Sequence, residues 1–166
     1  MERLFSPWRS QYIATFSDKN KKSDQGCLLC NAAKGKNDSR NLILLRRPLC
    51  FVMMNLYPYN SGHLLIVPYT HTPHMAGLSK REYTEIMSTS SRMMELLSST
   101  LQPNGFNFGA NIGREAGAGI DQHVHFHVVP RWSGDTNFMP TLADTKLVSE
   151  AIEATYRRLK KNLKKG

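Results

Sequence analysis

The sequence has no apolar run close to the roughly 20 residues that a membrane-spanning helix requires. Its first residues, Met1 to Trp8, lack the long apolar core of a signal peptide. Only three cysteines are present, and an odd number does not suit a disulfide framework. These absences predict a cytoplasmic protein with no membrane partner, whose core forms without disulfides.

Acidic residues are missing from the last ten positions, 157–166, where six of the basic side chains gather: Arg157, Arg158, Lys160, Lys161, Lys164 and Lys165. The formal net charge is +9, so the rest of the chain carries only +3. A basic end attracts polyanions in general, but it is also typical of a solvated helix end, where the helix dipole favours cations. The charge permits a phosphate-bearing substrate and does not by itself indicate a nucleic-acid partner.

The spacing of apolar residues predicts one α+β domain over residues 1–166, with an antiparallel sheet of about five strands and two main helices. The predicted strands are Leu42–Leu45, Cys50–Asn55, His63–Pro68, Phe106–Ile112 and His123–Pro130. The second and third are expected to form a hairpin. One helix should follow the capping box Ser79–Glu82, with Met87 on its apolar face, and the other should span Thr145–Leu163. The polar segments 17–26 and 31–41 are predicted to be loops around a C-x-x-C motif, and Cys50 to be buried.

Three histidines, His123, His125 and His127, alternate with Val124, Phe126 and Val128. On a strand, alternate side chains share a face, so the three imidazoles should line one face while the apolar residues enter the core. Buried imidazoles need hydrogen-bond partners, which makes a purely structural role improbable. Two chemistries fit the array: metal binding, or nucleophilic attack on phosphorus by a neutral imidazole.

A glycine-rich segment, Gly113–Gly119, comes shortly before the histidines. Backbone N–H groups of such loops commonly hold phosphate oxygens. A loop of this kind is weak evidence alone, but its position beside three histidines on one face favours phosphorus chemistry.

The run His123–Val129 matches the alternating histidine motif of the histidine triad superfamily, and Asn55–His63 matches its N-x-x-P-x-x-x-G-H segment. The sequence therefore resembles this superfamily over about residues 25–140. Two further stretches, Phe5–Ile13 and Pro130–Phe138, look like the bacterial diadenosine tetraphosphate phosphorylase type. The resemblance implies a homodimer whose sheets join.

The resemblance also implies roles for individual residues. His125 would be the nucleophile, His127 would contact the α-phosphate and His63 would orient the triad. Asn55 would reach the ribose, and Asn111 stands where related hydrolases carry a polar phosphate contact. Gly117 and Gly119 are expected to bind phosphate through the backbone N–H groups of the glycine-rich loop. Three purely structural alternatives remain open: Asn55 caps a turn, Asn111 is a loop residue at the end of a strand, and His63 is a core histidine with its hydrogen bonds made within the protein. Phosphoramidase relatives carry a serine before the triad, whereas residues Gly119–Gln122 contain none.

Zinc-containing relatives combine a C-x-x-C motif with two histidines. By this resemblance Cys27, Cys30, His71 and His123 would form a closed structural zinc site. His74 is a rival for His71, and a pair of reduced thiols is the alternative.

These patterns together predict an enzyme that cleaves a dinucleoside polyphosphate at the α-phosphorus through a nucleotidyl-histidine intermediate, with phosphate or water as the acceptor. A hydrolase of adenylylated amines, or a nucleotidyl transferase, is the alternative enzyme. A nucleotide- or nucleic-acid-binding module is the alternative from another class; it would show strong salt dependence and no turnover.

Overall fold

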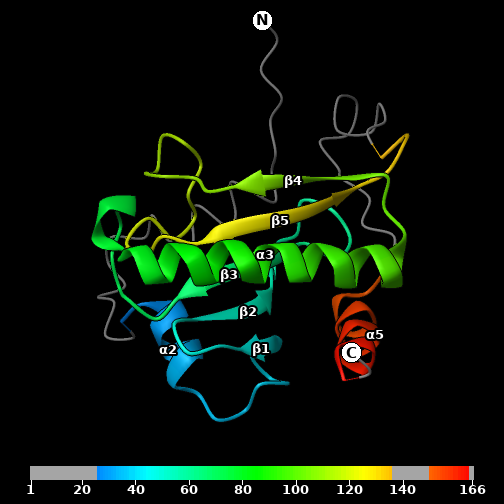
Figure 1. Cartoon of the computed structure of the whole chain (residues 1–166), viewed down its shortest axis with the longest axis horizontal. Coiled ribbons are helices and arrows are strands. Elements are labelled where there is room, and N and C mark those ends of the chain that lie inside the picture. Colours follow the sequence, from blue (N-terminus) through cyan, green and yellow to red (C-terminus); the bar gives the residue numbers. More distant parts are fainter. Residues whose placement is uncertain (1–25, 136–149, 165–166) are drawn as a thin grey trace, which may run out of the picture.

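The structure is a computed structural model, and it describes residues 26–135 and 150–164 (Figure 1). Several predicted features lie outside these residues: the segment Phe5–Ile13, most of the loop 17–26, the positions after Asp135 in the second phosphorylase-like stretch, and residues 145–149 of the last helix.

Five strands form one antiparallel sheet in the order β1-β2-β3-β5-β4. They are β1 (Ile43–Arg46), β2 (Cys50–Met54), β3 (Leu64–Pro68), β4 (Gly105–Gly109) and β5 (Phe126–Arg131). The predicted α+β class and the β2–β3 hairpin are confirmed. Because β5 pairs with both β3 and β4, the histidine segment lies beside the centre of the sheet.

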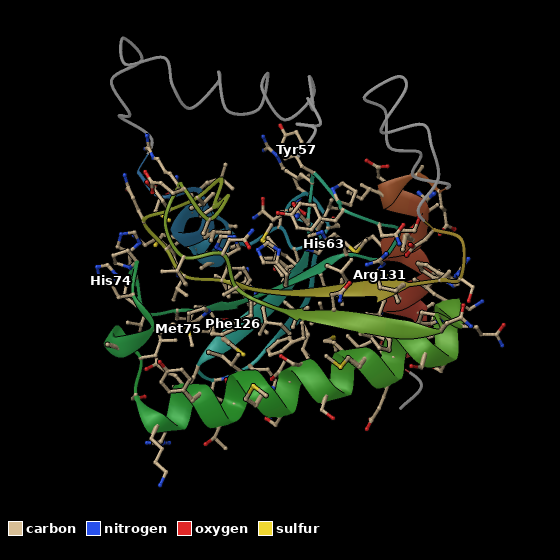
Figure 2. All side chains as sticks on the ribbon, turned by 90° about the horizontal axis from the view of Figure 1, so that it is seen from above. Tyr57, His63, His74, Met75, Phe126 and Arg131 are labelled. Atoms are coloured by element: carbon tan, nitrogen blue, oxygen red, sulfur yellow. The ribbon has the colours of Figure 1, made fainter. Side chains whose placement is uncertain are left out.

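Both faces of the sheet carry apolar side chains, and helices cover each face. The helices α3 (Lys80–Leu101) and α5 (Ile152–Leu163) close one core, in which Val52, Ile66 and Val128 are fully buried. Alternate strand residues face the other way and pack against α2 (Leu28–Lys34). Figure 2 shows α3 along one side of the sheet and α2 on the opposite side.

The helix α2 corrects the prediction of a loop from residue 31 onward. Leu29 and Ala32, three positions apart, are buried against the sheet and give this short polar segment one apolar stripe. A helix of seven residues contains too few apolar positions for its period to be recognised in the sequence.

The long helix α3 begins as predicted. Ser79 accepts a hydrogen bond from the Glu82 amide at 3.3 Å, and the Glu82 carboxylate accepts one from the Ser79 amide at 2.7 Å. The placement of Met87 on its apolar face is wrong, because Met87 is 55% exposed. The helix ends at Leu101, and its C-cap residue Gln102 takes a left-handed conformation. None of the helices in the described ranges has the length and apolar content needed to cross a bilayer.

The last helix, α5, begins at Ile152, so the predicted start at Thr145 is too early: Glu150 and Ala151 are described and are not helical. Its Lys160 ammonium donates to the Leu44 carbonyl at 2.7 Å, and burial lowers the pKa of this lysine. Part of the basic C-terminal end therefore covers the outer edge of β1 instead of being solvated. A short 3₁₀ helix, η1 (Met75–Gly77), connects β3 to α3.

Candidate active site and metal cluster

The histidine segment enters the sheet later than predicted. The strand β5 begins at Phe126, so His127 lies in the strand while His123 and His125 precede it. Its partner β3 ends at Pro68, and the main chain of the segment bonds beyond that point to a loop: the Val124 amide donates to the Thr72 carbonyl at 2.7 Å.

The alternation expected from the sequence is nevertheless present. Val124, Phe126 and Val128 all belong to the core under α3. The three histidines alternate with them and are 1%, 5% and 8% exposed, in chain order. Burial of an imidazole without hydrogen-bond partners costs folding free energy. The hydrogen bonds of each ring also determine which nitrogen carries the proton and which keeps a lone pair.

His125 is held as a neutral imidazole with one free nitrogen. Its Nδ1 donates to the His123 carbonyl at 2.8 Å, and a carbonyl can only accept. The proton is therefore on Nδ1, and Nε2 keeps its lone pair. Burial lowers the pKa of His125, so the ring is neutral near pH 7. This is the form in which an imidazole acts as a nucleophile.

His127 is oriented by His63 through a chain of hydrogen bonds. The Tyr59 amide N–H donates to His63 Nδ1 at 3.0 Å, so the His63 proton is on Nε2. This Nε2–H donates to His127 Nδ1 at 2.9 Å, which leaves the His127 proton on its own Nε2.

The Nε2–H of His127 is a buried donor that has no partner among the described residues. Burial, followed by repulsion from His125, lowers the pKa of His127 to about 4. A neutral ring with a free N–H beside His125 can donate to an oxygen that gains negative charge.

The turn before β3 brings His63 into this position. Gly62 has φ of +77°, and a Cβ there would come within 2.6 Å of Leu101 Cδ1 on α3. Glycine alone fits both the conformation and the close approach. His63 follows it and is fully buried.

Asn55 makes the turn contact that the sequence offered as the alternative to a ribose contact, and it also contacts His63. Its Oδ1 accepts from the Tyr57 amide at 3.0 Å, which closes the turn after β2. Its Nδ2 donates to His63 Nδ1 at 3.2 Å. On the other side of the site, Asn111 donates from Nδ2 to the Tyr59 hydroxyl oxygen at 3.2 Å. Sequence reasoning did not single out Tyr59, which is an unremarked x position within the matched segment.

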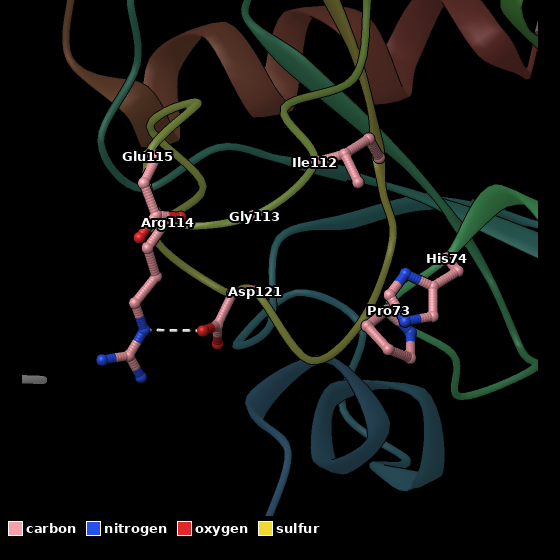
Figure 3. A pocket seen from close by; sticks show the side chains of 7 residues that line it. All are labelled: Pro73, His74, Ile112, Gly113, Arg114, Glu115 and Asp121. Carbon is pink, nitrogen blue, oxygen red and sulfur yellow. Dashed lines mark hydrogen bonds and ion pairs between the residues drawn. The ribbon is translucent and has the colours of Figure 1, made fainter.

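The glycine-rich segment forms a closed loop beside a pocket of about 340 Å³, whose walls include Pro73, His74 and Ile112 (Figure 3). The Gly117 amide donates to the Arg114 carbonyl at 2.8 Å, so it is already used within the loop. Gly119 lies in the bend that follows. The Arg114 guanidinium pairs with Asp121 at 2.6 Å and bridges the two ends of the loop.

The C-x-x-C motif and two histidines form a compact cluster. The ligand atoms of Cys27, Cys30, His71 and His123 all lie within 4.8 Å of one another. His123 Nδ1 is 3.4 Å from each of the two sulfurs and 3.3 Å from His71 Nδ1. Ligands of a tetrahedral zinc ion, bound at about 2.0–2.3 Å, are separated by roughly these distances. His74 is not in the cluster; its ring lines the pocket of Figure 3.

His123 meets the cluster in the protonation state that a metal requires. Its Nε2–H donates to the Pro68 carbonyl at 3.0 Å, so the lone pair is on Nδ1, facing the two thiols. The third cysteine, Cys50, is fully buried in the core as predicted, and burial raises the pKa of its thiol to about 11.

Comparison with known proteins identifies the family of this chain. A family model described as the HIT domain matches residues 36–134. The AP-4-A phosphorylase of Mycobacterium tuberculosis is 33% identical over 162 residues, covering 96% of this chain and 83% of that protein. The bis(5'-adenosyl)-triphosphatase of Dictyostelium discoideum is 30% identical over 89 residues, covering 54% of this chain and 59% of that protein.

A solved structure has the same fold. It is a zinc-bound histidine triad family protein from Mycobacterium smegmatis, with a TM-score of 0.69, 22% identity and coverage of 84% of this chain and 94% of that one. At this identity the similarity concerns the fold alone.

Proposed function

Because this chain belongs to the HIT domain family, we propose that it cleaves dinucleoside polyphosphates at the α-phosphorus, with His125 as the nucleophile. One observation carries this proposal: the bond from His125 Nδ1–H to the His123 carbonyl leaves the Nε2 lone pair free. The named activities of two relatives, a phosphorylase and a triphosphatase that act on such compounds, support the same substrate class.

The first step forms a bond between His125 Nε2 and the α-phosphorus and breaks the bond from that phosphorus to the bridging oxygen. The leaving nucleoside polyphosphate keeps the electron pair. The His123 carbonyl stabilises the positive charge that develops on the His125 ring. His127 donates its free Nε2–H to a phosphate oxygen, and His63 holds His127 in the tautomer that makes this possible.

In the second step a phosphate ion or a water molecule attacks the same phosphorus, and the P–N bond breaks. The electron pair returns to Nε2, and the neutral His125 is regenerated. When water is the acceptor, it gives up one proton to the solvent. In this proposal Asn55 contacts the ribose of the nucleotide, and Asn111, Gly117 and Gly119 lie on the side of the site that would hold its phosphates. The Gly117 amide is used within the loop, so a contact with phosphate through this amide requires the turn to open.

Zinc is the metal that the cluster of Cys27, Cys30, His71 and His123 fits best. Two thiolates and two imidazoles leave no open position, so a zinc ion there supports the fold and does not activate water. The residues themselves link this cluster to the site, because His123 offers its ring to the cluster and its carbonyl to His125.

A homodimer is the proposed assembly. The edge of β1 is covered by Tyr156 and Lys160, which donate to the carbonyls of Ile43 and Leu44. The opposite edge, β4, is exposed over its last three residues, and Phe108 is 38% exposed there. Exposed sheet edges are usually covered in native proteins, so a second copy pairing at β4 would complete the fold.

Incubation with diadenosine tetraphosphate, with and without inorganic phosphate, tests the proposed reaction. ADP and ATP as products indicate phosphorolysis, whereas AMP and ATP indicate hydrolysis. Release of AMP from an adenylylated amine, with no cleavage of diadenosine tetraphosphate, would show that the protein is instead a hydrolase of adenylylated amines. Nucleotide binding without turnover of either substrate would contradict the enzyme proposal.

A further inference from the structure

Tyr59 connects two parts of the site that are distant in sequence. Its ring lies nearly parallel to that of His127, with centroids 5.6 Å apart and an interplanar angle of 18°, and its centroid is 4.7 Å from that of His63. Its backbone amide fixes the tautomer of His63. Its hydroxyl oxygen accepts a hydrogen bond from Asn111 at 3.2 Å. One side chain therefore spans from the histidines to the start of the glycine-rich loop.

Two hydrogen-bond donors near Tyr59 have no acceptor among the described residues. The phenol oxygen accepts from Asn111, and no acceptor for the phenol proton is found among the described residues. The stacked ring of His127 carries the buried Nε2–H that also has no acceptor there. Donors grouped without an acceptor are the arrangement that suits an anion with several oxygen atoms.

We propose that the Tyr59 hydroxyl donates a hydrogen bond to a non-bridging phosphate oxygen of the bound nucleotide. Asn111 is then a positioning residue that aims the phenol. This inference rests on the proposed function, because it names a further group that holds the phosphate in the same site. It assigns phosphate recognition partly to a neutral phenol, which contributes a hydrogen bond and no charge.

The variant Tyr59→Phe isolates the hydroxyl. It keeps the ring that packs on His63 and His127, and it keeps the backbone amide that fixes the His63 tautomer. Calorimetric titration of the full chain with AMP and with adenosine measures binding without any need for turnover. We expect the Kd for AMP to rise roughly tenfold to a hundredfold, the loss typical of one hydrogen bond to a charged group. The Kd for adenosine, which has no phosphate, should be unchanged.

The variant Tyr83→Phe is the matched control. It removes a hydroxyl that donates to the Met75 carbonyl, on the α3 side of the sheet. Its affinity for AMP should equal that of the wild type. Asn111→Ala should weaken AMP binding, but the double variant with Tyr59→Phe should lose little more than Tyr59→Phe alone, because the two residues act as one unit.

An unchanged AMP affinity in Tyr59→Phe would overturn the inference, as would an equal loss for AMP and adenosine, which indicates a general structural role. Both of these results leave the proposed function standing, since the wild type still binds the nucleotide. A wild-type chain that binds neither AMP nor adenosine would contradict the proposed function, and this inference with it.

Discussion

The Nδ1 nitrogen of His125 lies 2.8 Å from the backbone carbonyl oxygen of His123. This contact joins two histidines with different tasks. The ring of His123 faces the cysteines, with Nδ1 3.4 Å from each sulfur, while its carbonyl determines which nitrogen of His125 carries a lone pair. Because the bond uses a main-chain oxygen, the local path of the backbone sets the orientation of His125.

Replacing His125 with Asn should abolish turnover and preserve binding. Asparagine keeps a polar side chain at this buried position but supplies no nucleophilic nitrogen. We expect turnover of diadenosine tetraphosphate to fall by several orders of magnitude, which is typical for the loss of a covalent nucleophile. The Kd for AMP should change little in calorimetric titration.

The variant His127→Asn is the natural comparison, because it removes a donor and not the attacking atom. Its turnover should fall less than that of His125→Asn. Brief incubation of the wild type with labelled substrate, then denaturation, should trap an acid-labile, base-stable label on His125. A label on His127, or near wild-type turnover by His125→Asn, is incompatible with the mechanism.

Activity should persist below the ordinary pKa of histidine. Burial and repulsion from His125 lower the pKa of His127 from 6.5 to about 4, and burial lowers that of His125 in the same direction. As the pH falls through 6.5, both rings therefore stay neutral, and protonation removes activity only as the pH approaches the lowered values. We expect the acid limb of kcat/KM for diadenosine tetraphosphate to lie clearly below pH 6.5. A midpoint at or above 6.5 would show that the reactive histidine titrates as an exposed one does.

The sequence was sufficient to predict that five strands form, where the long helix begins and on which faces the histidines lie, but not where the strands of Phe106–Ile112 and His123–Pro130 begin and end. Val124, Phe126 and Val128 alternate with the histidines, so the two sets point to opposite faces. Burial of the apolar set in the core fixes which face each set takes. The capping box of Ser79 and Glu82 is equally local. These features depend on side-chain type and spacing, which the sequence states directly.

The tautomers could not be predicted in this way. They depend on main-chain groups: the carbonyl of His123, the carbonyl of Pro68 and the amide of Tyr59. Every residue has a similar backbone amide and carbonyl, so the sequence does not indicate which of them bonds to a histidine ring. The two bonds that join groups 4 and 55 positions apart are known only from the folded chain. The contacts of Tyr59 could not be predicted for the same reason, since they connect distant segments.

Zinc content should depend on His71 and not on His74. The wild type should contain close to one zinc per chain by elemental analysis, and the double change of Cys27 and Cys30 to Ser should remove it. His71→Ala deletes one ligand atom of the cluster, whereas His74→Ala changes a ring that lines the pocket. The first variant should lose most of the metal and the second should keep it.

Loss of the metal should also lower the melting temperature, because binding of a structural metal is coupled to folding. His125 itself remains in the chain, so residual turnover is expected at temperatures where the metal-free protein is folded. A metal-free wild type that is fully folded, or equal zinc loss in the two histidine variants, would contradict this assignment.

Dimerisation should depend on β4, the sheet edge that α5 does not cover. Light scattering at micromolar concentration should give about twice the chain mass of 18.8 kDa. Phe108→Lys places a charge on the exposed edge, and charged edge residues oppose strand pairing between chains. This variant should shift the mass toward that of one chain at the same concentration.

Met87→Lys is the control, because it alters another exposed apolar residue, 55% exposed on α3 and away from β4, and should leave the mass unchanged. A wild-type mass near 18.8 kDa would refute the dimer, and an unchanged mass for Phe108→Lys together with a lower one for Met87→Lys would move the interface from β4 to α3.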